Sequence, residues 1–351
     1  MPKNYLEMFN DLVEEKEHQS KFSDKNDRIL LIDGLNTFIR NFSVNPTTND
    51  DGTHVGGLAG SLKSIALAIR TTTPTACVVV FDGKGGSTKR RKLFPTYKAN
   101  RKVHRRLNRT DFHDGIDEGE AMKRQIVRLF EYLEALPIKT MMFDGMEADD
   151  VIGYICSNLY PDSEKVIYSS DRDFIQLIDD KITIWNPIKK MTQDENWVEH
   201  EFGMSPKNYL IYRTMDGDKS DDIDGVKGCG FKTLQKKLPL LFEEEIVNIE
   251  DVLKYSDEHK SEAKVLENIS NESDKLHRNY ELMQLLDVDI PTTAKSKIRS
   301  IMDSNDAGLR RGSINQMLLE DKMFGAFKNL DYWIRSSFTT LQAFLSSKWV
   351  K

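Results

Sequence analysis

The sequence predicts an α/β protein built around a parallel β-sheet. Short runs that are entirely apolar alternate along the chain with longer segments of helical periodicity. Parallel strands are covered on both faces and therefore consist of continuous apolar residues, and each is joined to the next by a right-handed crossover that contains a helix. Two of the apolar runs lead directly into Asp-Gly, and the carboxyl ends of strands are where open α/β sheets hold their functional sites.

The composition describes a globular chain of 351 residues, 39% apolar and 30% charged, with room for one large core or for a core and an appended domain. No apolar run approaches the ~20 residues that a membrane span requires, and residues 1–27 lack the apolar stretch of a secretory signal. Cys77, Cys156 and Cys229 are odd in number and widely spaced, which favours a reducing cytoplasm and argues against a disulfide framework or a zinc site. The net charge of −6 does not by itself indicate nucleic acid, but the distribution of that charge does.

The first elements are a weak amphipathic helix over residues 4–18, a buried strand over residues 29–32 and a helix over residues 56–70. A second buried strand follows over residues 76–81. The two strands end at Asp33 and Asp82, each followed by glycine. One interpretation is a plain turn, since Asp-Gly is a common turn pair. The other is a pair of acids at one edge of the sheet.

Residues 84–110 have the most uneven charge of any stretch of the chain, with eleven lysines and arginines and no acid. Gly85, Gly86 and Pro95 argue against one long helix here. The segment is either a solvated basic loop or a phosphate-binding element, and the acidic motifs that surround it in the sequence favour the second. Because it has few apolar groups and its charges repel, we expect it to be mobile without nucleic acid and to become ordered when phosphates neutralise it.

A helix over residues 118–136 and a strand over residues 138–143 lead into the central motif, residues 143–155. Glu147, Asp149 and Asp150 stand here before an apolar run that predicts a helix, with both aspartates in its first turn and Val151, Ile152 and Ile155 turned inward. The helix macrodipole favours acids at a helix N-terminus and would account for one such cluster. The recurrence of acids at other strand ends indicates a metal site instead.

Strands are also predicted over residues 165–168 and 182–185. The first leads into Asp171 and Asp173, although Ser170 and Asp173 also fit a helix capping box. A helix over residues 206–215 is followed by Asp218 and Asp221.

The remainder of the chain is predicted to be mainly helical. Residues 225–234 hold three glycines in a tight turn, which lets backbone amides approach a phosphate, although such turns are a weak signal alone. Helices are expected over residues 240–290, and the aromatic and aliphatic residues of 312–349 indicate helices that pack on the core.

The acids share one expected position, the carboxyl edge of the sheet. Like charges that close together raise each other's pKa strongly, and divalent cations relieve the repulsion. All-oxygen ligation without Cys or His favours Mg²⁺, with Mn²⁺ as a substitute, and two ions roughly 4 Å apart would clamp a phosphodiester. No Ser-His-Asp or Cys-His arrangement competes, and Lys84 is not in a Walker loop. The candidate ligands are Asp33, Asp82, Glu147, Asp149, Asp150, Asp171, Asp173, Asp218 and Asp221.

Six motifs occur in order: Ile32-Asp33-Gly34, Phe81-Asp82-Gly83, Pro95-Thr96-Tyr97-Lys98-Ala99-Asn100-Arg101, Glu147-Ala148-Asp149-Asp150, Ser170-Asp171-Arg172-Asp173 and Gly217-Asp218-Lys219-Ser220-Asp221-Asp222. Together they resemble the flap endonuclease-type 5′ nucleases, and most closely the bacteriophage RNase H branch, over about residues 28–290. The resemblance implies a PIN-like parallel-sheet core over residues 28–204 with a helical arch at about 84–117. It further implies a helix–three-turn–helix DNA-binding region over 205–304. Residues 1–27 and 305–351, an extension and C-terminal helices, lie outside the motifs.

The same resemblance implies a role for each site residue. Asp33, Asp82, Glu147 and Asp149 would hold a first metal; Asp149, Asp171, Asp173 and Asp221 would surround a second, with Asp150 and Asp218 in support. Lys98 and Arg101 would be catalytic residues of the arch. DNA would be bound by Arg90, Arg91, Tyr97 and Lys102 and by Gly225, Gly228, Gly230 and Lys232 of the glycine turn, where K⁺ is a further expected ion.

The implied activity is a metal-dependent 5′-3′ exonuclease and flap endonuclease that also removes RNA primers paired to DNA during replication. The expected partners are nicked or flapped DNA, RNA–DNA hybrid, a single-strand-binding protein and a sliding clamp. We expect a cytoplasmic monomer, in the host cytoplasm if the chain is viral.

The sequence is also compatible with two alternatives. One is a PIN-like endoribonuclease that shares the acidic sheet. The other is a structure-specific DNA-binding protein without cleavage, which would have no reason to assemble the full set of carboxylates.

Overall fold

The computed structural model describes residues 27–100, 117–243, 246–327 and 329–347. Its centre is a six-stranded sheet in the order β3-β2-β1-β4-β5-β6, parallel except for β6 at one edge. The strands are β1 (Arg28–Asp33), β2 (Ala76–Asp82), β3 (Lys139–Phe143), β4 (Glu164–Tyr168), β5 (Ile182–Asn186) and β6 (Met191–Gln193). The predicted α/β class and the five predicted parallel strands are confirmed.

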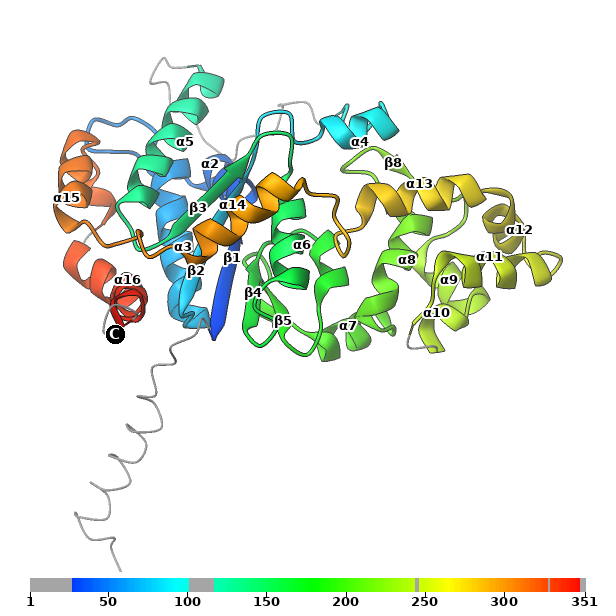
Figure 1. Ribbon diagram of the computed structural model, residues 1–351. Helices are drawn as coiled ribbons and strands as arrows, with labels where there is room; N and C mark the ends of the chain where they lie inside the picture. Colours follow the sequence, from blue (N-terminus) through cyan, green and yellow to red (C-terminus); the bar gives the residue numbers. More distant parts are fainter. Residues whose placement is uncertain (1–26, 101–116, 244–245, 328, 348–351) are drawn as a thin grey trace, which may run out of the picture.

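The sheet separates two hydrophobic cores because neighbouring residues of a strand point to opposite faces. Leu30 and Ile32 of β1 face a core built with α2 (Gly34–Val44), α3 (Gly56–Thr72) and α5 (Glu118–Glu134). Ile29 and Leu31 face the other core, which includes α6 (Ala148–Asn158) and α14 (Thr292–Asp303). Figure 1 shows these helices on either side of the strands. The apolar residues of β1 are fully buried, which explains why the strand is an unbroken apolar run.

Helix α2 was not predicted, because Asp33-Gly34 was interpreted as a turn or a strand end. The Asp33 carboxylate accepts a hydrogen bond from the Asn36 amide at 3.0 Å and so caps the helix that follows. Phe38 and Phe42, one turn apart, then bury the inner face of α2.

The second half of the chain forms a helical region beside the sheet. Its elements are η1 (Asp173–Leu177), α7 (Glu195–Phe202), α8 (Pro206–Asp216), the two-residue strands β7 (Gly217–Asp218) and β8 (Ile223–Asp224), α9 (Phe231–Lys237), α10 (Leu240–Glu243), α11 (Ile249–Glu258), α12 (Lys264–Asn271) and α13 (Ser273–Met283). Met215, Val226 and Leu234 of this region belong to the same buried core as β1 and α6. The core therefore runs without interruption from the sheet into the helical region.

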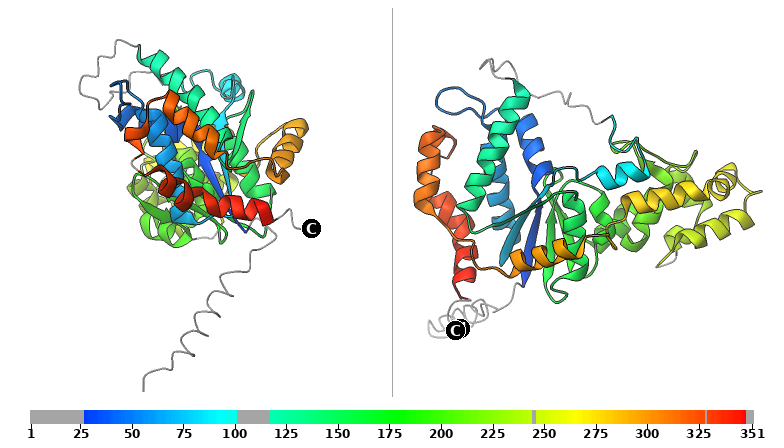
Figure 2. Two further views of the ribbon diagram at one scale, coloured as in Figure 1. Left: turned by 90° about the vertical axis from the view of Figure 1, so that its left-hand side faces the viewer. Right: turned by 45° about the horizontal axis from the view of Figure 1, so that its top comes forward.

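The chain returns to the sheet through α14, which packs against β3. The buried Lys139 of β3 donates hydrogen bonds to the carbonyl groups of Ile301 and Ser304, both at 2.7 Å, at the C-terminal end of α14. The last helices, α15 (Arg311–Glu320) and α16 (Leu330–Ser347), are separated by the short η2 (Phe324–Ala326) and pack at the opposite end of the molecule from α9–α12 (Figures 1 and 2).

The expectation that the C-terminal aromatic and aliphatic residues pack on the core is confirmed: Ile334, Phe338 and Leu341 are buried against α3 and β2. The helix predicted over residues 4–18 lies outside the described residues. Among the residues that the structure describes, no helix is long and apolar enough to span a membrane.

Candidate acidic site and its basic cover

The acids gather where β1, β2 and β4 end. Asp33 closes β1, Asp82 closes β2, and Asp171 lies three residues beyond β4. The chain leaves β1 toward β2 on one side and reaches β4 on the other, so β1 and β4 form the topological switch point of the sheet. This position puts the predicted acids together although they are far apart in sequence.

Each of these three acids is held by a backbone amide. Besides capping α2, Asp33 accepts a hydrogen bond from the Ser169 hydroxyl at 3.3 Å, and it is only 6% exposed. Asp82 accepts one from the Ala148 amide at 2.7 Å, at the first residue of α6. Asp171 accepts one from the Asp173 amide at 3.0 Å. The carboxylates are thus oriented by the local fold.

The central motif opens α6 as predicted, with Asp149 and Asp150 in its first turn and Val151 buried behind them. Glu147 and Asp150 form a capping box, so ordinary helix capping accounts for part of this cluster. The capping box expected as an alternative for Ser170 and Asp173 is absent. There the Ser170 hydroxyl donates to the Asn36 side chain at 3.2 Å, and Asp173 begins η1.

The pKa shifts of the acids indicate that several of them lie near one another. Burial, together with the charges of Asp171 and Asp82, raises the pKa of Asp33 from 3.8 to about 7. Burial, Asp171 and Asp33 raise the pKa of Asp149 well above its usual range. The pKa of Asp173 rises to about 7 from burial and from the charge of Asp171, against the opposing effect of Arg213. Folding therefore concentrates negative charge that the cations of the described residues offset only in part, since the pKa values of these three acids stay raised.

The donor set fits a hard divalent cation. Within the described ranges, no three His, Cys, Asp or Glu side chains are drawn tightly enough together to form a preassembled metal-binding group. The acids are nevertheless close enough to raise each other's pKa, and carboxylate oxygens are the ligands that Mg²⁺ prefers. A cation drawn among them would relieve the repulsion that the pKa shifts record.

The start of the basic segment covers this site. The Lys98 ammonium donates to Glu147 with 2.5 Å between Nζ and Oε1 and lies 3.7 Å from Asp221 Oδ2. Its backbone φ is +54°, in the left-handed region that a side chain disfavours, and its amide donates to the Asp221 carbonyl at 2.9 Å. Tyr97, 3% exposed, donates its hydroxyl to Glu147 at 3.2 Å.

Arg90 lies on the short helix α4 (Thr88–Leu93) and turns inward as well. Its guanidinium donates to Glu147 at 2.6 Å and to Asp150 at 2.7 Å, and its side chain is 13% exposed. The expected DNA binding by Arg90 and Tyr97 stays a prediction; in this structure both side chains contact acids of the protein. Burial opposes the charge of Glu147, but Lys98 and Arg90 hold its pKa below the usual range.

The expectation that the basic segment is mobile without nucleic acid stays a prediction, but two of its few apolar groups are packed in the described part. Phe94 and Tyr97 pack in a small third core with Leu210, Ile223 and Leu282. Asn100 further donates both its backbone and side-chain N–H groups to the Asp222 carboxylate, each at 2.8 Å. Arg91 donates to the Tyr97 carbonyl at 3.3 Å. The predicted catalytic Arg101 and DNA-binding Lys102 lie outside the described residues.

A further cation of the site, Arg213 of α8, was not foreseen. It lies 3.2 Å from Asp173 and 2.5 Å from Asp218, with its side chain 11% exposed. Burial opposes ionisation of Asp218, but Arg213 and hydrogen bonds from Ser220 hold the pKa of this carboxyl below its usual range. The sequence offered one signal: Arg213 lies five residues before Asp218, on a helix whose neighbouring residues are largely apolar.

The glycine turn joins β8 to α9. A Cβ on Gly225 would come within 2.3 Å of the Asp216 carbonyl oxygen, so this position must be glycine for the chain to pass. Gly228 has φ +92°, which a side chain strains, whereas Gly230 precedes α9 at φ −70° and a Cβ added there would meet no atom within 4 Å. Lys232, in the first turn of α9, is exposed.

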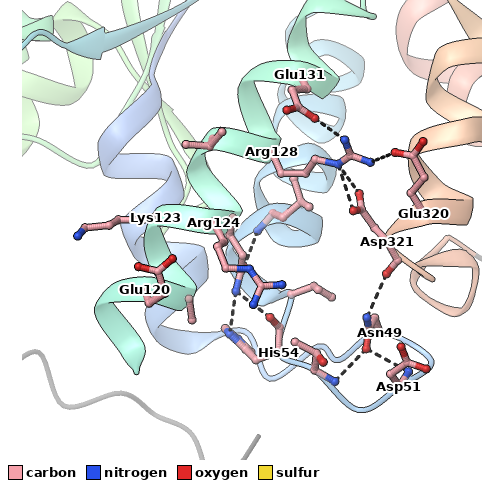
Figure 3. Close-up of a pocket in the computed structure, with 16 residues that line it drawn as sticks. Asn49, Asp51, His54, Glu120, Lys123, Arg124, Arg128, Glu131, Glu320 and Asp321 are labelled. Atoms are coloured by element: carbon pink, nitrogen blue, oxygen red, sulfur yellow. Dashed lines mark hydrogen bonds and ion pairs between the residues drawn. The ribbon is translucent and has the colours of Figure 1, made fainter. Parts of the chain in front are cut away.

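A cavity of 690 Å³ lies apart from the acids, between α5, the loop after α2 and the residues after α15 (Figure 3). Gln125 and His54 both line it, and Gln125 donates to the His54 carbonyl at 2.8 Å. At its rim, Arg128 pairs with Glu320 at 2.6 Å and Asp321 at 2.9 Å. These contacts fasten the C-terminal helices to α5.

Comparison with known proteins gives one family. The family of the 5′-3′ exonuclease N-terminal resolvase-like domain matches residues 28–203. A 5′-3′ exonuclease of Buchnera aphidicola is 29% identical over 281 residues, which cover 78% of this chain and 91% of the relative. The thermostable DNA polymerase I of Thermus caldophilus is 30% identical over 260 residues, 74% of this chain but only 28% of the polymerase.

Among solved structures, a bacteriophage T5 flap endonuclease in complex with DNA and metal ions aligns with a TM-score of 0.58 and 20% identity. The alignment covers 84% of this chain and all of the T5 protein. At that identity the likeness establishes a shared fold.

Proposed function

The chain belongs to the 5′-3′ exonuclease family and is a 5′ nuclease that hydrolyses phosphodiester bonds, and from this premise we propose that it removes 5′ ends and 5′ flaps from duplex DNA. We extend the proposal to RNA primers paired to DNA, as an RNase H-type activity in replication. The observation that carries it is the gathering of acids at the β1/β4 switch point beneath a basic segment. The family decides against the non-cleaving DNA-binding protein and the endoribonuclease as alternatives.

We assign the nine acids to two Mg²⁺ ions, with Mn²⁺ as a substitute. Asp33, Asp82, Glu147 and Asp149 would hold one ion; Asp149, Asp171, Asp173 and Asp221 would surround the other, with Asp150 and Asp218 in support. The raised pKa values of Asp33, Asp149 and Asp173 support this assignment. When bound, the ions supply Lewis-acid activation of water and stabilisation of the leaving oxygen.

The remaining chemistry falls to the protein's own side chains. Lys98 and Arg101 would stabilise the charge that develops on the phosphate during cleavage. The contact between Lys98 and Glu147 supports the position of Lys98 at the acids. Asn36 and Ser169, which hydrogen-bond to groups at the ends of β1 and β4, would keep the carboxylates oriented.

We propose that the duplex part of the substrate binds at the glycine turn. Gly225, Gly228 and Gly230 would let backbone amides approach the phosphates, beside the exposed Lys232 and a bound K⁺. Arg91 and Lys102 would contact the strand that carries the 5′ end. We propose that the chain is organised in four units: an N-terminal extension at 1–27, a catalytic core at 28–204, a DNA-binding region at 205–304 and C-terminal helices at 305–351.

We further propose that the protein acts as a cytoplasmic monomer and meets a single-strand-binding protein and a sliding clamp at the replication fork. The experiment that tests the central proposal uses a labelled nicked duplex that carries a 5′ flap. We expect release of the flap with Mg²⁺ and none with EDTA. A protein that cleaves the flap equally well in both would refute the metal-dependent mechanism, and one that leaves it intact in both would refute flap cleavage.

A further inference from the structure

Helix α4, at the start of the basic segment, lies between the acidic site and the helical region. It packs against α13, and the views of Figures 1 and 2 agree on this position. Only six residues long, it has no buried side chain of its own. The position of α4 must therefore be fixed mainly by side chains that extend from it to other elements. The most buried of these side chains is Arg90.

One guanidinium group joins three helices. Arg90 Nη1 and Nη2 lie 2.6 Å from Glu147 and 2.7 Å from Asp150, at the start of α6. On the other side, Nε donates to the Leu282 carbonyl at 2.8 Å, in the last turn of α13. In the last turn, helix carbonyls lack partners within the helix and attract positive charge. A planar, multiply donating guanidinium can make all three contacts at once, and a lysine ammonium cannot.

Helix α13 continues this connection to the glycine turn. Its buried Asn279 donates to the carbonyl groups of Thr214 and Asp224, both at 2.9 Å. Asp224 immediately precedes Gly225, the first residue of the turn. A continuous series of hydrogen bonds and one rigid helix therefore connects the glycine turn to Glu147 by way of Arg90.

We propose that Arg90 is a positioning residue, which transmits duplex binding at the glycine turn to α4 and the Glu147 carboxylate. This inference rests on the proposed function, because it takes the glycine turn as the duplex site. Duplex bound there stabilises α13, α13 holds Arg90 through the Leu282 carbonyl, and Arg90 fixes α4 and Glu147 for cleavage. The nuclease thereby cuts efficiently only where a duplex adjoins the 5′ end.

The first test compares two substrates at saturation in single turnover: the flapped duplex and a single-stranded oligonucleotide of the flap sequence. Arg90→Ala should lower the ratio of the two rates by about 10-fold, within the range of typical couplings between sites. Arg90→Lys, which keeps the charge, should lower it less. The matched control is Lys89→Ala, which removes an exposed ion pair to Asp289 from the same helix and should keep the wild-type ratio.

The second test requires neither metal nor cleavage. In EDTA, a blunt duplex added to the wild-type protein should slow amide hydrogen exchange both at residues 225–237 and at residues 88–97. In Arg90→Ala, the protection should be confined to residues 225–237. Loss of rate on both substrates alike, or equal protection of residues 88–97 in both proteins, would overturn the role of Arg90. Absence of protection at residues 225–237 in the wild type would instead refute the duplex site of the proposed function, and with it this inference.

Discussion

Lys98 donates a hydrogen bond to Glu147, with Nζ 2.5 Å from Oε1, and so connects the basic segment to the residue that caps α6. The two residues are 49 positions apart in the sequence. A lysine that serves only as one phosphate contact among many would have no reason to be buried against a carboxylate. We therefore expect it to act at the reacting phosphate.

Lys98→Ala should lower the saturating single-turnover rate by about 10²-fold, comparable to the loss of one preorganised donor, and should change affinity much less. Lys92→Ala, on the same segment but exposed, is the matched control and should lose a little affinity at a nearly normal rate. If the two variants behave alike, Lys98 is a phosphate contact and its catalytic role is wrong.

Asp171→Asn and Asp149→Asn should abolish turnover and preserve DNA binding. Each change removes a ligand charge with little change in volume, so the fold should persist. Binding of the flapped duplex is measured in Ca²⁺, and cleavage in Mg²⁺. Wild-type rates in either variant would remove the assignment of two metal ions to these acids.

The metal-free protein should respond to pH through Asp33. Its pKa is raised from 3.8 to about 7, chiefly by burial, so the folded state binds more protons than the unfolded state between these values. Stability from this group is therefore present at low pH and is lost as the pH rises toward 7. In EDTA, Asp33→Asn should become progressively more stable than the wild type over that interval, as measured by urea unfolding. A difference that stays constant with pH would show that folding does not raise the pKa of Asp33.

The glycine turn gives a prediction with its own control. Gly228→Val forces a branched side chain to adopt φ +92° and should weaken binding of the duplex part of the substrate. At Gly230 an added Cβ meets no protein atom within 4 Å, so any loss of duplex affinity in Gly230→Val reports a clash with DNA rather than strain. Thermal unfolding separates the two cases: the midpoint should fall for Gly228→Val and remain for Gly230→Val. Equal loss on a single strand would indicate misfolding instead.

Arg213→Leu should lower the free energy of unfolding by about 3–5 kcal/mol, the usual effect of removing one partner of a buried ion pair. The substitution leaves Asp173 and Asp218 without their cation. Adding Asp218→Asn should restore part of the loss. The nearby, exposed Arg172→Leu is the control, and an equally large effect there would mean that general surface charge, not the buried pair, is responsible.

Periodicity and the residues at strand ends predicted the parallel strands, the shared position of the acids and the start of α6. The apolar runs located every parallel strand, and the acids at their ends indicated that these residues share one edge of the sheet. The start of α6 was predicted closely, because Asp149 and Asp150 precede an amphipathic run. By contrast, α2 was missed because Asp33-Gly34 has the composition of a turn, and only the bond to the Asn36 amide shows it to be a helix cap.

The rest depends on partners that are distant in the sequence. A run of basic residues does not reveal which of them turns inward, and Arg90 is 57 residues from Glu147 and 192 from the Leu282 carbonyl. The burial of Phe94 and Tyr97 likewise requires α13, which is formed much later in the chain. Arg213 was missed because its ion pairs form only when η1 and the β7–β8 turn bring Asp173 and Asp218 close to it in the folded chain.

The carboxylates of Asp33, Asp82 and Asp171 each accept a hydrogen bond from a backbone amide through Oδ1. Their side-chain torsions are consequently fixed when the chain folds. The rotational entropy of these carboxylates is therefore lost during folding and not during ion capture, which should make cation binding stronger than it would be for mobile side chains. An asparagine keeps an oxygen for the amide and preserves the orientation, whereas an alanine removes the helix cap together with the charge. Comparing Asp33→Asn with Asp33→Ala therefore separates the role of the carboxylate oxygen in capping α2 from the role of its charge in binding a cation.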